Sequence, residues 1–302
     1  MEQRRRIGAY GLCRDGDRVL LARASDKSYF PGVWQIPGGG LEHGEAPSDA
    51  LVREFREETG LEIEIVRPLT ALASVRELRD IEVSWHFDLI VYEARVLRGT
   101  LRREVAGTSD DVAWVAERDL ADLRVMPFTA ELLGQPVVPL DFAAPHPLGR
   151  RLPPPPLRTD RGQRFAAYGL VTSPRGVLLT RISEGFPGAG KWHLPGGGTD
   201  FGEQPAAGLL RELAEESGQV GEIVELLAVS DHRNPRALGP EGYPIDWHAV
   251  RVVYRVDVAV PTEPRVAEVG GSTVDARWFT PGELPALTLT DVAAVAVRSW
   301  VA

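Results

Sequence analysis

The 302-residue sequence contains a single cysteine, Cys13, and only two methionines. One cysteine excludes an intrachain disulfide, so nothing here favours an oxidising compartment, and we expect Cys13 to be a buried apolar residue. No stretch reaches the roughly 18 consecutive apolar residues of a membrane span, and the N-terminus lacks the apolar core of a signal peptide. The sequence therefore predicts a cytoplasmic protein that does not enter membranes.

The chain has no excess of positive charge: its formal net charge is −9. Proteins that bind nucleic acid polymers usually present clustered Lys and Arg to the phosphate backbone, so we expect no nucleic acid polymer as a partner. We interpret the short run Arg4 to Arg6 as a solvated N-terminal arm. The hydrophobic fraction of 43% and the charged fraction of 25% are ordinary for globular proteins.

The sequence repeats itself at a fixed distance of 158 positions. Ala9-Tyr10-Gly11-Leu12 returns as Ala167-Tyr168-Gly169-Leu170, and Pro37-Gly38-Gly39-Gly40 returns as Pro195-Gly196-Gly197-Gly198. Close to half of the positions between 9 and 60 are identical in the second copy. A period this long is far beyond a solenoid repeat and indicates a duplicated domain.

The repeat predicts a domain at residues 1–134, a proline-rich linker at 135–161 and a second domain at 162–302. The unbroken run Pro153 to Pro156 favours an extended conformation, so we interpret the linker as a semi-rigid spacer.

Alternation of apolar and polar residues predicts mostly strands within each copy. In copy one, Ala9 to Cys13 and Arg18 to Ala22 form a predicted hairpin around Asp15-Gly16-Asp17. One helix per copy is marked at both ends, by a proline in its first turn and by a glycine after its last residue. These helices are predicted at 47–59 and 205–217, with shorter ones near 117–123 and 281–287.

The first of these helices carries Glu54, Glu57 and Glu58 at spacings i, i+3 and i+4, which places the carboxylates on one face. The second helix carries Glu212, Glu215 and Glu216 in the same arrangement. Crowded carboxylates repel one another, and a hard divalent cation relieves that repulsion, with oxygen ligands favouring Mg²⁺ or Mn²⁺. An isolated acidic helix face is more simply a solvated surface. The three glycines before each helix argue for a site, because they let backbone groups approach a metal or phosphate.

These residues resemble the box of the Nudix family, G-x5-E-x7-R-E-U-x-E-E-x-G-U, in which U is a bulky apolar residue. Copy one fits every specified position, listed as Gly39, Glu45, Arg53, Glu54, Phe55, Glu57, Glu58, Gly60 and Leu61. Copy two fits at Gly197, Glu203, Arg211, Glu212, Leu213, Glu215, Glu216 and Gly218. Its departure is Gln219, which replaces the final apolar residue and puts local packing there in doubt.

The resemblance implies an α+β fold, an α/β/α sandwich, in two tandem copies, each with a mixed sheet and a loop–helix–loop catalytic box. It implies hydrolysis of the pyrophosphate linkage of a small nucleoside diphosphate derivative, by water attack on phosphorus. Divalent ions would be held by Glu54, Glu57, Glu58, Glu212, Glu215 and Glu216, with the backbone of Gly38 and Gly196. Arg53 and Arg211 resemble the family arginine that orients a neighbouring glutamate.

Several further residues have two readings. Glu54 and Glu212 are the first candidates for a general base, with Glu104 and Glu268 as later alternatives. Trp34 and Trp192 are either core residues or base-stacking residues. His86 and His248 are more simply structural, and Arg23 and Arg181 either contact phosphate or are exposed charges.

The sequence leaves other functions open. A regulatory module of this family could bind a nucleotide without cleaving it, although two full sets of carboxylates weigh against that. One copy could be active while the other supports it as an intrachain pseudo-dimer partner. The box does not specify which nucleotide derivative is the substrate.

Overall fold

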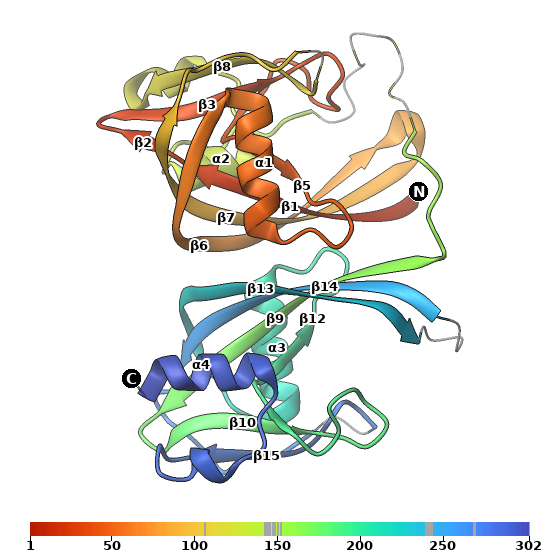
Figure 1. The fold of residues 1–302 in the computed structure, drawn as a ribbon, viewed down its shortest axis with the longest axis vertical. Helices are drawn as coiled ribbons and strands as arrows, with labels where there is room; N and C mark the ends of the chain where they lie inside the picture. The colour runs from red at the N-terminus through yellow and green to blue at the C-terminus, as the bar shows by residue number, and fades with distance from the viewer. Residues whose placement is uncertain are drawn as a thin grey trace. The chain divides into compact units, whose positions relative to one another are not determined.

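The computed structural model describes residues 1–105, 107–141, 146, 149, 151, 153–238, 244–267 and 270–301. By their internal contacts these residues form two compact units, residues 1–163 with 231–248 and residues 164–230 with 249–302. Figure 1 shows the elements of each. Every helix in the described ranges is too short or too polar to span a bilayer.

The first copy contains two β-sheets. One has the strand order β5-β1-β7-β6, formed by Gly38–Gly40, Glu2–Leu12, Val83–Gly99 and Leu61–Leu78. The other contains β2 (Arg14–Asp15), β3 (Arg18–Ala24), β4 (Trp34–Gln35) and β8 (Ser109–Ala116). Because β1 runs parallel to β7 and antiparallel to β5, the first sheet is mixed as predicted.

The second copy forms one sheet. Its central path is β11 (Trp192–His193), β10 (Gly176–Ile182), β9 (Arg161–Ser173), β14 (Pro244–Asp257) and β13 (Glu222–Leu238). In addition, β12 (Gly196–Gly198) pairs with β9, and β15 (Thr273–Phe279) pairs with β10. The α+β class is thus confirmed in both copies.

The main helices, α1 (Pro47–Thr59) and α3 (Pro205–Ser217), have the predicted bounds. Gly60 and Gly218 end them in the left-handed conformation, with φ of 74° and 68°. Leu51 and Phe55 are fully buried and attach α1 to the sheet. A Cβ at Gly11 of β1 would lie 2.6 Å from the Phe55 ring, so the glycine there is needed for close helix packing.

The shorter helices were predicted less well. Residues 117–122 form a 3₁₀ helix, η2, and a separate α2 follows at Pro127–Leu132. Near the C-terminus only Leu284–Ala286 is 3₁₀ helical, η3, whereas the longer α4 occupies Asp291–Val301. A short η1 (Arg79–Ile81) lies between β6 and β7.

Two other predictions were wrong in detail. The turn at Asp15-Gly16-Asp17 joins β2 to β3, and β1 lies in the other sheet. The run Arg4 to Arg6 is no solvated arm, because β1 starts at Glu2 and pairs along its whole length with β7. Arg4 is 8% exposed, and Arg5 binds the buried carboxylate of Asp88 at 2.7 Å.

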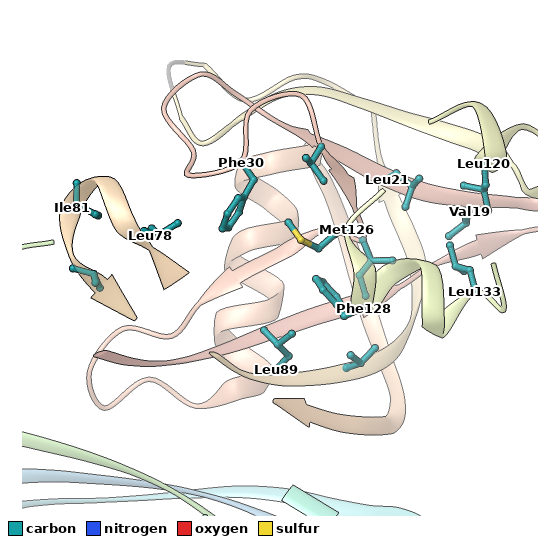
Figure 2. Packing of buried hydrophobic residues seen from close by; sticks show 14 residues of the cluster. Val19, Leu21, Phe30, Leu78, Ile81, Leu89, Leu120, Met126, Phe128 and Leu133 are labelled. Atoms are coloured by element: carbon teal, nitrogen blue, oxygen red, sulfur yellow. The ribbon is translucent and has the colours of Figure 1, made fainter. Parts of the chain in front are cut away.

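The core of the first copy lies between the two sheets and is covered by α2. Phe30, Leu89, Met126 and Phe128 are among its buried residues, which Figure 2 shows from close by. Cys13 is fully buried as predicted, and burial raises the pKa of its thiol to about 12.

The linker is less detached than a plain spacer. The described residues of the run 153–158 have no helix or strand, as expected of polyproline. Just before them, however, Arg151 is 5% exposed, and its Nη1 donates to Asp80 Oδ1 at 3.1 Å. This part of the linker therefore packs on the first copy.

Candidate active site

An arginine on each main helix gathers the carboxylates of its box. Arg53 Nε and Nη2 donate to the two oxygens of Glu45 at 2.8 and 2.9 Å. Its Nη1 donates to Glu54 at 2.9 Å and to Glu57 at 3.4 Å, and Nη2 also reaches the Gly40 carbonyl at 3.1 Å. These bonds raise the pKa of Arg53 and lower the pKa of Glu45. The guanidinium fork thus connects the loop before α1 to its acidic face.

The second copy builds the same network. Arg211 makes a bidentate pair with Glu203 at 2.9 and 3.1 Å. It also donates to Glu212 and to Glu215, both at 3.1 Å. Arg211 therefore forms an ion pair with Glu212 as Arg53 does with Glu54.

The last carboxylate of each box is buried and ties the helix to two strands. Glu58 is 3% exposed, accepts a bond from the Gly38 N–H at 2.9 Å, and accepts another from the Ser109 hydroxyl at 2.6 Å. Glu216 is 2% exposed and is bound by the Gly196 N–H at 2.9 Å and by the Thr273 hydroxyl.

Burial has a strong electrostatic effect on this carboxylate. Desolvation raises the pKa of Glu58 to about 8, against its two hydrogen bonds, and repulsion from Glu54 and Glu104 adds to the rise. The pKa of Glu54 is also raised by desolvation, while the ion pair with Arg53 opposes the rise. The site thus concentrates carboxylates where negative charge is costly, which is the electrostatic setting that a divalent cation would relieve.

Each of the three loop positions requires glycine for a different steric reason. A Cβ at Gly38, where φ is +138°, would overlap the Ala9 carbonyl of β1. A Cβ at Gly39 would lie 2.5 Å from the Glu54 carboxylate carbon, and one at Gly40 would overlap the Arg6 guanidinium. Because the three glycines have no side chains, the backbone of β1, the Glu54 carboxylate and the Arg6 guanidinium can each pack directly against the loop backbone.

The carboxylates share one helix face, as the spacing predicted, but their oxygens are held by different partners. Glu58 accepts hydrogen bonds from β5 and β8, whereas Glu57 is 52% exposed and, among the described residues, is bound only by Arg53. Among the described residues no three His, Cys, Asp or Glu side chains already converge on one point. The donor set nevertheless fits Mg²⁺, which takes oxygen ligands, keeps several waters and needs only one or two protein carboxylates.

The aromatic and histidine candidates are mainly structural. Trp34 and Trp192 are half-buried and pack against the two hydrophobic cores. His86 is fully buried and lies 3.1 Å from Asp88 Oδ1, in agreement with a structural histidine. His248 is fully buried as well.

The remaining candidates are partly occupied by other contacts. Arg23 forms an ion pair with Asp110 at 2.7 Å, whereas Arg181 is exposed. Glu104 accepts a bond from the Ser109 N–H at 3.0 Å and is close enough to raise the pKa of Glu58. Glu268 lies outside the described residues.

Gln219, the departure in the second box, is well accommodated. Its side chain is 2% exposed, its amide nitrogen donates to Thr262 Oγ1 at 2.9 Å, and its amide oxygen accepts from the Thr262 N–H at 3.0 Å. A buried amide with these partners stabilises the turn after α3, so the departure leaves the box intact.

The sequence analysis did not identify a cavity in the first copy or the residues that line it. A cavity of about 280 Å³ in the first copy is lined by Ser74, Arg76, Pro127, Phe128, Val137, Pro139 and Leu140. The Arg76 guanidinium lies 4.5 Å from the centroid of the Phe87 ring, and burial lowers its pKa to about 10. Tyr10 packs edge-on against Phe128 at 5.2 Å.

The second copy has a different set of residues around the corresponding tyrosine. Tyr168 packs against His193 with 4.7 Å between ring centroids, and His193 Nδ1 lies 2.6 Å from the Thr290 hydroxyl. No local motif marks these residues, because strands distant in the sequence bring them together.

A family model described as the NUDIX domain matches residues 2–134 and 162–299. The chain belongs to the Nudix family. Its two boxes are thus two Nudix boxes, and the protein is a Nudix hydrolase, a pyrophosphohydrolase with tandem domains.

Relatives of this Nudix protein include a nucleoside triphosphatase NudI from Enterobacter sp. (strain 638), which is 36% identical over 123 residues, 38% of this chain and 79% of the relative. An 8-oxo-dGTP diphosphatase from Proteus vulgaris is 40% identical over 57 residues, 19% of this chain and 51% of the relative. The chain thus spans about half the length of the second relative. A solved MutT NUDIX hydrolase from Burkholderia pseudomallei is 29% identical, with a TM-score of 0.37, over 46% of this chain and 98% of that one.

Proposed function

We propose that both domains, taken as residues 1–134 and 162–302 with a linker at 135–161, hydrolyse the pyrophosphate linkage of a small nucleoside diphosphate derivative. The observation that carries this proposal is the duplication of one charge network. Arg53 joins Glu45, Glu54 and Glu57 in the first domain, and Arg211 joins Glu203, Glu212 and Glu215 in the second. A binding module would have no need of two such sets.

The proposed metal ligands are the backbone carbonyls of the two loops and three carboxylates of each helix, namely Gly38, Glu54, Glu57, Glu58, Gly196, Glu212, Glu215 and Glu216. Bound Mg²⁺ or Mn²⁺ would neutralise the phosphates and acidify a water. Glu57 and Glu215 are the most accessible of the carboxylates, with 52% and 46% of the side chain exposed. Glu58 and Glu216, by contrast, are held by a loop N–H and a hydroxyl, so they also fix the loop against the helix.

Glu54 and Glu212 are the proposed general bases. Desolvation raises the pKa of Glu54, which makes its carboxylate a better proton acceptor near neutral pH. Arg53 holds one oxygen of Glu54 at 2.9 Å, so the other oxygen is available to a water. Arg211 Nη1 likewise donates a hydrogen bond to Glu212, at 3.1 Å.

The substrate class is proposed from the relatives, one named a nucleoside triphosphatase and another an 8-oxo-dGTP diphosphatase. In the first domain the nucleoside would lie on the Tyr10 face of the sheet, near the cavity of Ser74, Arg76 and Phe128. The second domain places His193 beside Tyr168, so the two domains are expected to prefer different nucleosides.

The test is a screen of the full chain with Mg²⁺ or Mn²⁺ against nucleoside triphosphates, 8-oxo-dGTP, ADP-ribose, nucleotide sugars and dinucleoside polyphosphates. We expect metal-dependent cleavage of at least one class, abolished by a chelator. Glu62→Gln/Glu64→Gln is a matched control, since both carboxylates are exposed and paired with arginines on β7. Nucleotide binding without turnover would overturn the proposal in favour of a regulatory module.

A further inference from the structure

Both domains carry an exposed arginine on the strand beside the glycine loop. Arg6 lies in β1 and Arg164 in β9, and they occupy equivalent positions of the repeat. A Cβ at Gly40 would overlap the Arg6 guanidinium, and one at Gly198 would lie 2.5 Å from Arg164 Nε. Each guanidinium therefore lies directly on the third glycine of its loop.

The loop strand forms the edge of the sheet in the first domain. β5 pairs only with β1 in the strand order, and its residues face alternate sides of the sheet. Gly39 faces Glu54 on the side of α1, and Gly40 faces Arg6 on the other side. A carboxylate and a guanidinium thus lie on opposite sides of one glycine strand at the edge of the sheet.

Within the part of the chain that the structure describes, the charges of these two arginines are not neutralised by a carboxylate. Arg5, next to Arg6, binds Asp88, but no ion pair joins Arg6 or Arg164 to any residue that the structure describes. Arg6 is nonetheless within electrostatic range of the box, because its charge opposes the rise in the pKa of Glu54, and the charge of Arg164 opposes the rise in the pKa of Tyr168. In a chain with a net charge of −9, an unpaired guanidinium beside a carboxylate cluster is suited to an anionic ligand.

We propose that Arg6 and Arg164 bind the phosphate chain of the substrate where it passes around the glycine edge of each loop. A phosphate presents the oxygens that a guanidinium fork binds by two parallel hydrogen bonds. The inference rests on the proposed function, because the same phosphate chain would reach the metal-binding carboxylates on the other side. Arg6 and Arg164 are positioning residues, and the network of Arg53 and Arg211 is separate from them.

The test measures binding of inorganic tripolyphosphate to the full chain by calorimetry, in the presence of Mg²⁺. We compare wild type with Arg6→Ala, Arg164→Ala and the double variant, using Arg118→Ala as the control because that side chain is 79% exposed. Each single variant should lose about tenfold or more in affinity at one site, since one charge-assisted hydrogen bond is worth at least about tenfold. The control should retain both sites.

A kinetic measurement separates positioning from a structural effect. On a nucleotide substrate, Arg6→Ala should raise KM with little change in kcat, and Arg6→Lys should restore part of the affinity. Unchanged tripolyphosphate affinity and unchanged KM in the double variant would overturn the inference. If the alanine variants fail to fold, the Arg6→Lys/Arg164→Lys variant must still bind tripolyphosphate more weakly than wild type, and equal binding overturns it.

The inference and the hydrolase proposal can fail separately. A chain that binds tripolyphosphate through Arg6 and Arg164 but cleaves no nucleotide would contradict the hydrolase proposal while supporting the anion role. A chain that cleaves nucleotides with unaltered KM after both substitutions would do the reverse.

Discussion

At the scale of single residues, the box depends on one guanidinium that serves several carboxylates at once. Arg53 uses all three of its nitrogens, and the bonds to Glu45 are bidentate. An ammonium group is a compact point charge that cannot reproduce this planar fork, so lysine is not a conservative replacement here.

We therefore predict that Arg53→Lys lowers kcat of the first domain by about 10- to 100-fold, the usual effect of losing a group that orients a ligand. The measurement uses a chain whose second box is inactivated by Glu212→Gln/Glu215→Gln. Arg67→Lys is the matched control, because Arg67 is 60% exposed and pairs with the exposed carboxylate of Glu93, which is 43% exposed. An Arg53→Lys rate equal to that of the control would show that the fork is dispensable.

His193 should make the stability of the second domain depend on pH. Burial, with a smaller effect of Arg251, lowers the pKa of His193 to about 4. The unfolded chain has a histidine pKa of about 6.5, so on acidification it takes up the proton before the folded protein does. The stabilisation by neutral His193 is thus complete above pH 6.5 and is lost as the pH falls toward 4.

We predict that His193→Gln weakens this pH dependence by up to roughly 3 kcal/mol between pH 7 and pH 4. Glutamine is a suitable replacement because Gln35 occupies the equivalent position of the first copy. Denaturant unfolding at several pH values measures the difference, with the exposed His232→Gln as the control. Identical pH profiles for wild type and His193→Gln would refute the assignment.

At the scale of elements, the catalytic helix was predictable to the residue, whereas its surroundings were not. Proline at the start of α1 and glycine after its end are local signals, and they fix the ends whatever the tertiary structure. The partners of Glu58 come from β5 and β8. Such contacts join positions 20 and 51 residues away, and nothing local in the sequence encodes them.

The difference between local sequence signals and tertiary contacts also explains the predictions that were wrong. Arg4 to Arg6 form a charged run that is typical of a solvated arm, but they lie in β1, which pairs with β7, so that Arg4 is buried and Arg5 binds Asp88. The turn at Gly16 was correct as a turn, yet its strand partners depend on which sheet each strand joins. α4 was missed because no proline or glycine marks its ends.

The glycine loop is an element in which a single methyl group should matter. In Gly39→Ala the new Cβ would lie 2.5 Å from the Glu54 carboxylate carbon, so the carboxylate must move. We predict a loss of about 100-fold in kcat/KM of the first domain, because displacing a reacting group by about 1 Å has effects of this size.

The control for this prediction is Gly282→Ala, where an added Cβ meets no atom within 4 Å. Both variants should keep the far-ultraviolet circular dichroism of wild type. Full activity in Gly39→Ala would mean that the close approach of loop and carboxylate is not required.

At the scale of the whole molecule, the duplication preserves the charged residues and alters what surrounds them. Arg53, Glu54, Glu57 and Glu58 have identical counterparts and nearly identical bonds in the second copy. The face that carries Tyr10 in the first domain has Arg76 and Phe128, whereas Tyr168 meets His193. We therefore expect common chemistry with separate substrate preferences in the two domains.

The sequence alone established the family resemblance, the duplication and the box, because all three depend on residue identity and spacing. It did not point to the proposed role of Arg6 and Arg164 or to the cavity beside Arg76, because both depend on strand order. The identity of the substrate belongs to this second group of features.

The most direct test of two independent hydrolase sites is to inactivate the boxes separately. On substrates identified by the screen, Mg²⁺-dependent turnover is measured for Glu54→Gln/Glu57→Gln, for Glu212→Gln/Glu215→Gln and for the fourfold variant. Two working sites predict that each double variant keeps the activity of the other domain, that the two activities sum to wild type, and that the fourfold variant is inactive. Undiminished turnover in the fourfold variant would contradict the account.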